Sequence, residues 1–258
     1  MARSARDLRL LLSIIGESPI PVQAPPAELK RLKVALWLDE PTFTLDANIK
    51  AMLEAFAGRL HVAGAIVDQV ACPVSAECLM STYILLLFAI IGADLPWAER
   101  RLYELLRGPA KVARAMGANA LSWAQSVLAY TVRHHEWLQA NETRAQLSDT
   151  MRKFFARFDV LLAPVSPTAA FPHDHQPIRR RTLKCSDGHE IAYMEMLKWI
   201  ALATVCGLPA TAIPAGLNAQ GLPVGVQIIG PRGGDVLTLA VAQAIDEQIS
   251  GFRAPPLK

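Results

Sequence analysis

The sequence predicts an α/β protein, and two observations carry that prediction. Five short apolar runs have the length of strands, and they lie at residues 33–39, 64–70, 159–163, 210–214 and 224–229. The segments between several of these runs place apolar residues at helical spacing. Strands that alternate with helices are typical of a sheet covered by helices, and a strand–helix–strand unit usually gives a parallel pair. We therefore expect one mixed, largely parallel twisted sheet with helices on both faces.

The first 70 residues predict a helix followed by one strand–helix–strand unit. Ser4 is placed to cap a helix that ends at Ile15, and this helix has an apolar stripe of Leu8, Leu11, Leu12 and Ile15. A Pro-rich linker at residues 19–26 leads to the first strand. A helix over residues 46–60, with Ile49, Leu53 and Phe56 on one face, separates the first two strands.

The middle of the chain is helical in pattern and ends in an irregular segment. Residues 76–158 form a helical subregion, with breaks expected near residues 94–96, 108–109 and 117–119. The last helix is expected over residues 136–155. Residues 164–189 contain four prolines and follow the third strand. We expect residues 1–258 to form a single domain that contains this helical subregion.

The last two strands are marked by glycine and proline. Gly207 supplies the permissive backbone that a helix C-terminus favours, and Pro209 stops the helix that precedes it. A turn over residues 216–223 joins the two strands. Asp235 follows Gly233 and Gly234 and is placed to cap a closing helix.

Composition excludes several classes of protein. Hydrophobic residues make up 52% of the chain and charged residues 19%, which is a globular composition. The 26 basic and 23 acidic residues are interspersed, so we expect no nucleic-acid surface. The uncharged run at residues 78–93 is shorter than the ~20 residues of a membrane span, so we expect a buried helix and no membrane partner. The five tryptophans are scattered, as core anchors are.

Four cysteines and a histidine-rich loop raise the question of metal binding. Cys72, Cys78, Cys185 and Cys206 form no C-x-x-C pair, and this pattern favours reduced thiols in a cytoplasmic protein. A loop with His173, His175, Cys185 and His189 could in principle hold zinc. Its spacing matches no zinc pattern, and neighbouring aspartates make it equally a polar surface loop. We therefore expect no metal and no organic cofactor.

Three segments together resemble the C-terminal part of the amidase signature family of amide hydrolases. The most specific is residues 203–235, which reads ATVCGLPATAIPAGLNAQGLPVGVQIIGPRGGD. The run DVLLAPVSPTA at residues 159–169 is similar to a buried strand that ends in a Pro-rich loop on the substrate side. The opening MARSARDLRLLLSIIG resembles the helix that follows the catalytic segment of that family. The helical middle carries little of this resemblance.

The resemblance implies a serine nucleophile, a second serine on a cis peptide and a lysine base, framed by a Gly- and Ser-rich run. A lysine can act as a base only where its surroundings keep it neutral, and backbone N–H groups stabilise the oxyanion. In that family these groups precede the part that this sequence resembles. The 258 residues contain no Gly-Gly-Ser, no adjacent serines, no Ser-x-x-Lys and no Gly-x-Ser-x-Gly. We therefore expect no catalytic residue within them.

The resemblance also places the substrate-side residues. The expected substrate-binding set is Ser166, Pro167 and Thr168 in the loop, and Thr204, Cys206 and Gly207 at the turn. Thr204 stands where many members of the family have asparagine. Cys206 is expected to line a pocket and not to attack substrate, because no histidine base lies near it in the sequence.

Three hypotheses for function follow. The first is the C-terminal portion of an amide hydrolase, inactive alone, whose small-molecule amide substrate requires complementation. The second is a binding or assembly module, which pairs with an N-terminal partner chain or with a full-length homologue. If the chain folds alone, we expect it to associate with itself as a homo-oligomer. The third, a metal hydrolase that uses the histidine loop, is the weakest.

Overall fold

The computed structural model describes residues 1–16, 27–252 and 254. These residues fall into two compact units. The first comprises Met1–Cys72, Arg152–Ala203 and Leu208–Lys258, and the second comprises Pro73–Met151 and Thr204–Gly207. The second unit overlaps the helical subregion that the sequence predicts at residues 76–158. The Pro-rich linker expected at residues 19–26 lies outside the described residues.

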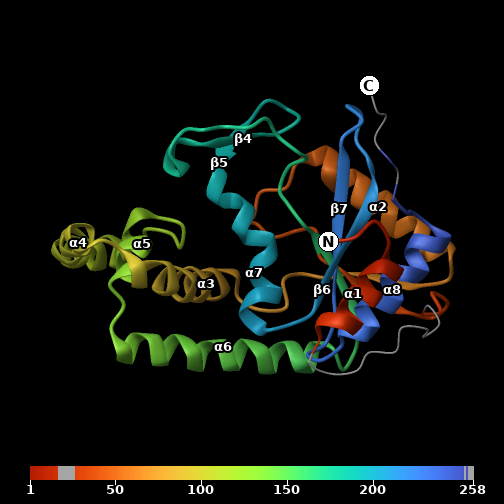
Figure 1. Ribbon diagram of the computed structural model, residues 1–258, viewed down its shortest axis with the longest axis horizontal. Coiled ribbons are helices and arrows are strands. Elements are labelled where there is room, and N and C mark those ends of the chain that lie inside the picture. Colours follow the sequence, from red (N-terminus) through yellow and green to blue (C-terminus); the bar gives the residue numbers. More distant parts are fainter. Residues whose placement is uncertain (17–26, 253, 255–258) are drawn as a thin grey trace. The chain divides into compact units, whose positions relative to one another are not determined.

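The first unit is built on a five-stranded mixed sheet with the order β2-β1-β3-β7-β6 (Figure 1). Its strands are β1 (Lys33–Leu36), β2 (Ile66–Gln69), β3 (Val160–Pro164), β6 (Ala210–Leu217) and β7 (Pro223–Ile229). The pairs β1–β2 and β1–β3 are parallel, whereas β7 is antiparallel to both β3 and β6. All five predicted strands therefore lie in one sheet. The predicted parallel pairing of β1 and β2, which the helix α2 (Ala47–Val62) connects, is confirmed. The first three strands are shorter than or shifted from their predicted bounds by one to three residues.

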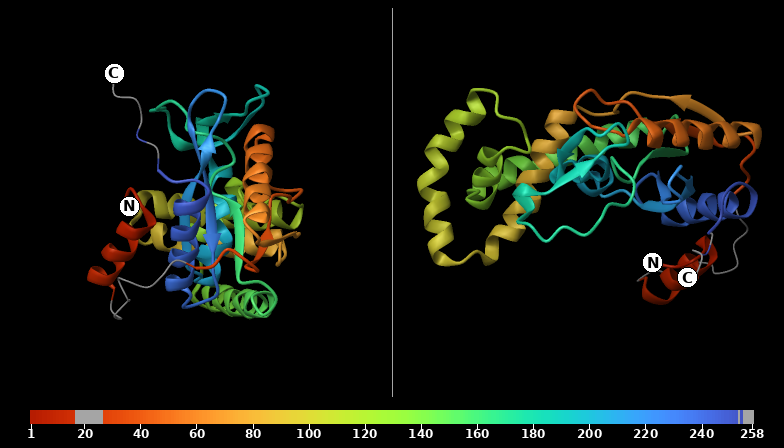
Figure 2. Two further views of the ribbon diagram at one scale, coloured as in Figure 1. Left: turned by 90° about the vertical axis from the view of Figure 1, so that its right-hand side faces the viewer. Right: turned by 90° about the horizontal axis from the view of Figure 1, so that it is seen from above.

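Helices cover both faces of this sheet. In the edge-on view of Figure 2, α1 (Ala5–Ile15) and α8 (Asp235–Gln248) lie on one side and α2 (Ala47–Val62) lies on the other. The predicted face of α2 is correct, because Ile49, Leu53 and Phe56 are all buried. Ser4 caps α1 as predicted, since its hydroxyl accepts a hydrogen bond from the Asp7 N–H.

The apolar stripe of α1 does not enter the core. The residues of α1 that are buried are Ala5 and Arg9, whereas Ile15 is 68% exposed. Asp235 is also placed differently from its prediction. Gly234 is the N-cap of α8, and Asp235 is the first residue of the helix. There its negative carboxylate interacts favourably with the positive end of the helix dipole.

The segment predicted to be irregular contains a small hairpin. Strands β4 (Thr182–Lys184) and β5 (Glu190–Ala192) pair in antiparallel fashion. A 3-10 turn, η2 (Ile178–Arg180), precedes them, and a second, η3 (Tyr193–Glu195), leads into α7 (Met196–Cys206). Strands of three residues each are too short to leave a periodic pattern in the sequence.

The second unit contains α3 (Ala76–Ile91), η1 (Gly92–Asp94), α4 (Trp97–Ala115) and α5 (Trp123–Tyr130), and α6 (His134–Phe154) begins in it. The break predicted near residues 108–109 is wrong, because α4 continues through Gly108 and Pro109. Proline removes one backbone hydrogen bond there, and the arginines on either side of it, Arg107 and Arg114, contact other helices. These contacts are described below.

Helix α3 and its extension η1 are apolar and long enough to cross a membrane, judged by length and composition alone. The stretch Ala76–Asp94 has 19 residues, and 39% of it is buried within the protein. Leu79, Met80, Ile84 and Phe88 are buried, which fits the predicted core helix, whereas Ile90 and Ile91 are exposed.

The tryptophans divide into two groups. Trp37 and Trp199 are fully buried and pack on each other with ring centroids 5.0 Å apart. Trp97, Trp123 and Trp137 are 73%, 49% and 40% exposed, so the prediction that all five are core anchors is wrong for these three.

Asp46 joins three segments of the first unit. Its carboxylate accepts hydrogen bonds from the N–H groups of Asn48 and Ile49 and thereby caps α2. It also accepts from the N–H and the hydroxyl of Ser186 in the β4–β5 turn, and its own N–H donates to the Pro167 carbonyl at 2.9 Å. Burial acts to raise the pKa of Asp46, but these hydrogen bonds outweigh burial and lower it.

Replacement of Asp46 should therefore destabilise the protein in a pH-dependent way. We expect Asp46→Asn to lose roughly 1–3 kcal/mol of unfolding free energy at neutral pH, since the amide can still cap α2 but loses the charge and presents an NH2 group to the Ser186 N–H. The pKa is lowered by folding, so the carboxylate stabilises above the ordinary value of 3.8 and loses its effect as pH falls through the folded pKa. Urea denaturation at several pH values should show the difference shrinking in acid.

The matched control is Asp39→Asn. Asp39 pairs with Lys50, and its side chain is 70% exposed, so its replacement should cost well under about 1 kcal/mol. Equal losses for the two variants would contradict the special role of Asp46.

Gly207 provides a second test of the fold. Its φ of +60° is the left-handed conformation predicted for this helix end, and a Cβ added there would meet no atom within 4 Å. Gly207→Ala should therefore cost about 1–2 kcal/mol through backbone conformation alone. Gly58→Ala, in the exposed middle of α2 and equally free of contacts, should instead stabilise by about 0.5–1 kcal/mol. Thermal denaturation measures both effects. A change in melting temperature of the same sign in both variants would contradict this account.

Candidate functional site

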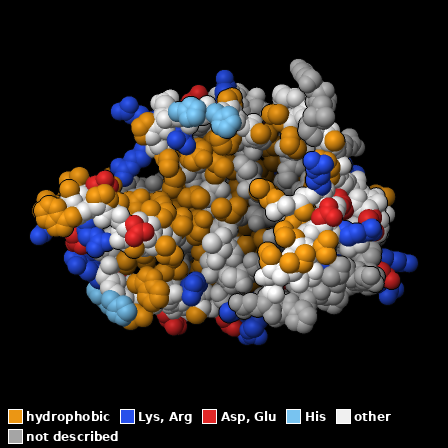
Figure 3. Space-filling model, in the orientation of Figure 1, with side chains coloured by type: hydrophobic (Ala, Val, Ile, Leu, Met, Phe, Trp, Pro, Cys, Tyr) orange, Lys and Arg blue, Asp and Glu red, His pale blue; other side chains and the backbone are white. Residues whose placement is uncertain are grey.

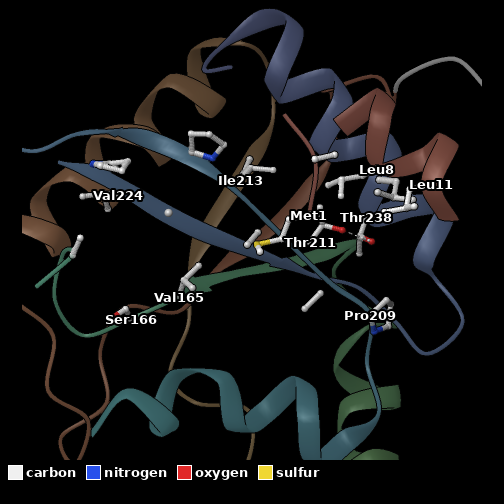
Figure 4. A pocket seen from close by; sticks show the side chains of 18 of the residues that line it. Met1, Leu8, Leu11, Val165, Ser166, Pro209, Thr211, Ile213, Val224 and Thr238 are labelled. Carbon is white, nitrogen blue, oxygen red and sulfur yellow. Dashed lines mark hydrogen bonds between the residues drawn. The ribbon is translucent and has the colours of Figure 1, made fainter. Parts of the chain in front are cut away.

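An apolar cavity of about 950 Å³ lies against the last two strands of the sheet in the first unit (Figure 4). Its walls come from α1, from the loop after β3, from β6 and β7, and from the start of α8. Leu8 and Leu11 of α1 line it together with Ile213 and Val224 of the two strands. The apolar stripe that the sequence predicts on α1 therefore lines this cavity and is not packed into the core.

The position of β6 in the sheet makes the cavity possible. Strand β6 is at one end of the strand order, and among the described residues it pairs with β7 alone. Ala210 and Ala212 are exposed, whereas the intervening Thr211 is buried. An edge strand presents unpaired backbone N–H and C=O groups, and such an edge pairs readily with another strand.

The loop after β3 brings the predicted residues Ser166 and Thr168 to the cavity wall, and Pro167 lies between them. The Thr168 N–H lies 3.5 Å from the Ser166 hydroxyl oxygen, and the Pro167 carbonyl is held by the N–H of Asp46. Thr168 is only 7% exposed, and its hydroxyl has no hydrogen-bond partner among the described residues. A buried hydroxyl without a partner is uncommon and costly.

The other three predicted residues lie at the end of α7 and belong to the second unit. None of Thr204, Cys206 and Gly207 lines the cavity. Cys206 is 2% exposed, and burial raises the pKa of its thiol to about 11 although the Ser148 hydroxyl lowers it. The thiol is therefore protonated at neutral pH and a poor nucleophile. The six residues thus fall into two groups, one in each unit.

The polar groups of the cavity are few. Besides Ser166 and Thr168, the lining contains Thr211, Thr238 and Asp235. The Thr211 hydroxyl donates to that of Thr238, which donates to the Asp235 carbonyl, each at 3.0 Å. Asp235 is the one titratable side chain among the described lining residues. The cavity can accommodate the apolar side chains of another segment or molecule. Its described lining holds no nucleophile paired with a base.

Sequence reasoning missed the cavity and the threonine pair. The stripe on α1 was the available signal, since four apolar residues at helical spacing require a covering surface. The histidine loop does not form a metal site: the described residues contain no group of three metal-ligating side chains suitable for an ion. The rings of His173 and His175 lie parallel with centroids 6.5 Å apart.

The fold is that of an α/β protein with a mixed sheet, helices on both faces and an apolar cavity beside an edge strand. The model of the Amidase family matches residues 1–239, and the chain belongs to this family. The family resemblance at the two ends of the sequence is thereby confirmed.

Curated relatives agree on the family and on the extent of the match. In Gluconobacter oxydans, the A subunit of glutamyl-tRNA(Gln) amidotransferase is 28% identical over 99% of this chain and 54% of its own length. The corresponding A subunit of Exiguobacterium sibiricum is 28% identical over 91% of this chain and 49% of its own length. The chain therefore spans about half the length of these relatives.

Two solved structures show the same fold. A fatty acid amide hydrolase superposes with a TM-score of 0.65 at 18% identity, covering 98% of this chain and 48% of that one. A chain from a vestigial protein complex, described as revealing the origins of an s-triazine catabolic enzyme, gives 0.68 at 18% identity, covering 98% and 54%.

The environment of Thr168 can be tested by removing hydroxyl groups. Thr168→Val should be neutral or stabilising, because its hydroxyl gives up hydration without gaining a bond. Thr211→Val, at a position of the same 7% exposure, breaks the bond to Thr238 and should cost about 1 kcal/mol. Chemical denaturation of both variants decides the matter: equal destabilisation would show that the Thr168 hydroxyl has a partner.

Proposed function

We propose that this chain provides the C-terminal half of an amidase scaffold and takes part in the hydrolysis of carbon–nitrogen amide bonds. The products are a carboxylate and ammonia or an amine. In this proposal the 258 residues supply the substrate-side loop and the last strands of the sheet. The serine, the relay serine and the lysine come from a polypeptide segment outside these residues, so the 258 residues are inactive alone.

One observation carries the proposal: a family match over residues 1–239 coincides with an apolar cavity beside the edge strand β6. The described lining of that cavity has no nucleophile–base pair, and the sequence contains none of the serine motifs searched for. The relatives are about twice as long as the region that matches. A second scaffold half that covers the cavity and extends the sheet from β6 accounts for all three facts.

In the complemented protein, the substrate acyl group approaches Ser166, Pro167 and Thr168. The family resemblance adds Thr204, Cys206 and Gly207 to the substrate-side residues, with Cys206 as a buried, protonated thiol outside the cavity beside β6. The reaction uses no metal and no organic cofactor, because a lysine-activated serine and backbone N–H groups suffice for acyl transfer. The four cysteines form no disulfide, which fits a cytoplasmic protein. In this proposal the chain has no nucleic-acid or membrane partner.

The exposed edge of β6 also favours a second function, that of a non-catalytic assembly module. Such a module pairs with an N-terminal amidase chain or a full-length homologue and stabilises it without contributing to turnover. The two functions share the docking surface and differ in whether this chain alters catalysis.

Complementation tests both functions. We expect the purified chain alone to release no ammonia from a panel of aliphatic and aromatic amides. Co-expression with the N-terminal half of the Gluconobacter oxydans relative should give a 1:1 complex that hydrolyses some of these amides. Ala212→Glu, which places a charge on the β6 edge, should abolish the complex, whereas Val62→Glu, at an 88% exposed position on α2, should not.

The outcomes separate the functions. A complex with turnover supports the catalytic proposal, and a complex without turnover supports the assembly role. Turnover by the chain alone contradicts the proposed division of the catalytic groups. Complex formation that Ala212→Glu does not weaken contradicts the docking surface.

A further inference from the structure

Helix α4 turns its arginine face toward its own unit. Arg100, Arg107 and Arg114 follow one another at intervals of seven residues and lie on one side of the helix. The first donates to the carbonyls of Gly92 and Ala93 at 3.2 and 3.0 Å, beyond the end of α3.

The other two arginines anchor the middle and the end of the helix. Arg107 is 8% exposed and donates to the carbonyl and hydroxyl of Thr131, and it forms an ion pair with Glu136. Arg114 pairs with Glu77 at 2.9 Å. These contacts fix the rotation of α4 about its axis, because each arginine reaches a partner on the same side.

The opposite side of α4 is apolar and faces solvent. Leu102, Leu105, Val112 and Met116 are 53%, 78%, 58% and 83% exposed. In Figure 2, α4 forms the outer side of the helical unit, with no other helix of that unit beyond it. Figure 3 shows apolar side chains gathered over this part of the molecule. The helix is therefore amphipathic in the reverse sense to an ordinary surface helix, whose apolar stripe faces the core.

The spacing of the exposed stripe points to a helical partner. With Pro109 included, the positions 102, 105, 109, 112 and 116 follow the three–four alternation of a heptad seam. Such a seam is narrower than the broad apolar face of a helix that lies in a membrane surface. The three arginines occupy the heptad position opposite the seam, so the whole seam is free for a partner.

We propose that α4 pairs with α4 of a second copy of this chain in an antiparallel helix pair that crosses at Gly108. In this register Leu102 of each copy packs against Val112 of the other, and Leu105 packs against Pro109. Met116 packs against Ala98. A two-fold axis relates the copies, as in most homodimers.

Small residues beside the seam permit this register. Gly108 meets its own counterpart at the crossing point, and a Cβ built on Gly108 has no neighbour within 4 Å inside its own chain. Arg101 lies opposite Ala115 of the other copy, and Glu99 lies opposite Ala113. No two like charges face each other, so the antiparallel pair carries no repulsion.

The interface is modest in size. A helix of 19 residues is about 28 Å long, so a single helix pair offers a short contact compared with interfaces of the roughly 1,200–2,000 Å² typical of stable complexes. We therefore expect association that depends on protein concentration. This surface is separate from the cavity beside β6, since none of the α4 residues lines that cavity.

The first test changes the seam. Sedimentation of the full chain should show a shift from the 28.1 kDa monomer toward twice that mass as concentration rises. The double variant Leu105→Glu, Val112→Glu should remain monomeric at the concentrations at which the unchanged chain is a dimer. Both positions are exposed, so the fold should persist, which circular dichroism and the melting temperature check. Ala212→Glu, at the β6 edge, should leave this dimer intact.

The second test fixes the register. Gly108→Cys should form a disulfide between two copies on mild oxidation, identified as a linked 108–108 peptide by mass spectrometry. Lys111→Cys, on a helix face turned away from the seam, should not. A pair of parallel helices would place the two 108 positions on opposite sides and would give no such link.

Several results would overturn the proposal. One is a monomer at every concentration, and another is a dimer that persists in the double variant. A third is a monomer whose seam binds vesicles of phosphatidylserine and phosphatidylcholine and loses that binding in the double variant, because the occupant would then be lipid.

Discussion

The carboxylate of Asp46 is the constraint on which the candidate site depends. It caps α2, holds the β4–β5 turn through Ser186, and its own backbone N–H fixes the carbonyl of Pro167. The loop that carries Ser166 and Thr168 is therefore attached to a helix on the opposite face of the sheet. A charged acceptor with several donors is worth more than neutral hydrogen bonds, and its low pKa keeps it charged at neutral pH. The carboxylate contacts fix the position of Asp46, and its backbone N–H in turn holds the loop of the cavity wall.

The two units expose apolar side chains at different kinds of surface. In the first unit, the stripe of α1 and the edge strand β6 bound a cavity that another polypeptide can fill. In the second, α4 directs its arginines inward and exposes a seam of branched and flexible apolar side chains. Contiguous exposed apolar surface is uncommon on monomers and marks interaction sites. Both surfaces therefore have physical reasons to be covered.

Strands with a regular apolar pattern, and helix ends marked by capping residues or glycine, were predictable from the sequence. The five strands, the cap at Ser4 and the permissive Gly207 all follow from local chemistry, which does not depend on distant contacts. The continuation of α4 through Pro109 was not predictable, because proline usually ends a helix and the contacts of Arg107 and Arg114 with other helices cannot be read from the sequence. The β4–β5 hairpin was missed for a related reason. Its turn is held by Asp46, a residue 140 positions away in the sequence from Ser186.

The substrate-side loop shows where sequence reasoning about the site ends. The family resemblance predicts Ser166 and Thr168 as substrate-side residues, and both line the cavity. It did not reveal that the Thr168 hydroxyl is buried without a partner among the described residues, because that depends on which atoms fold over it. A cavity with an unsatisfied hydroxyl, an edge strand and little charge is better suited to receiving another polypeptide than to catalysis by itself. That combination favours a scaffold half whose site is completed by a second segment.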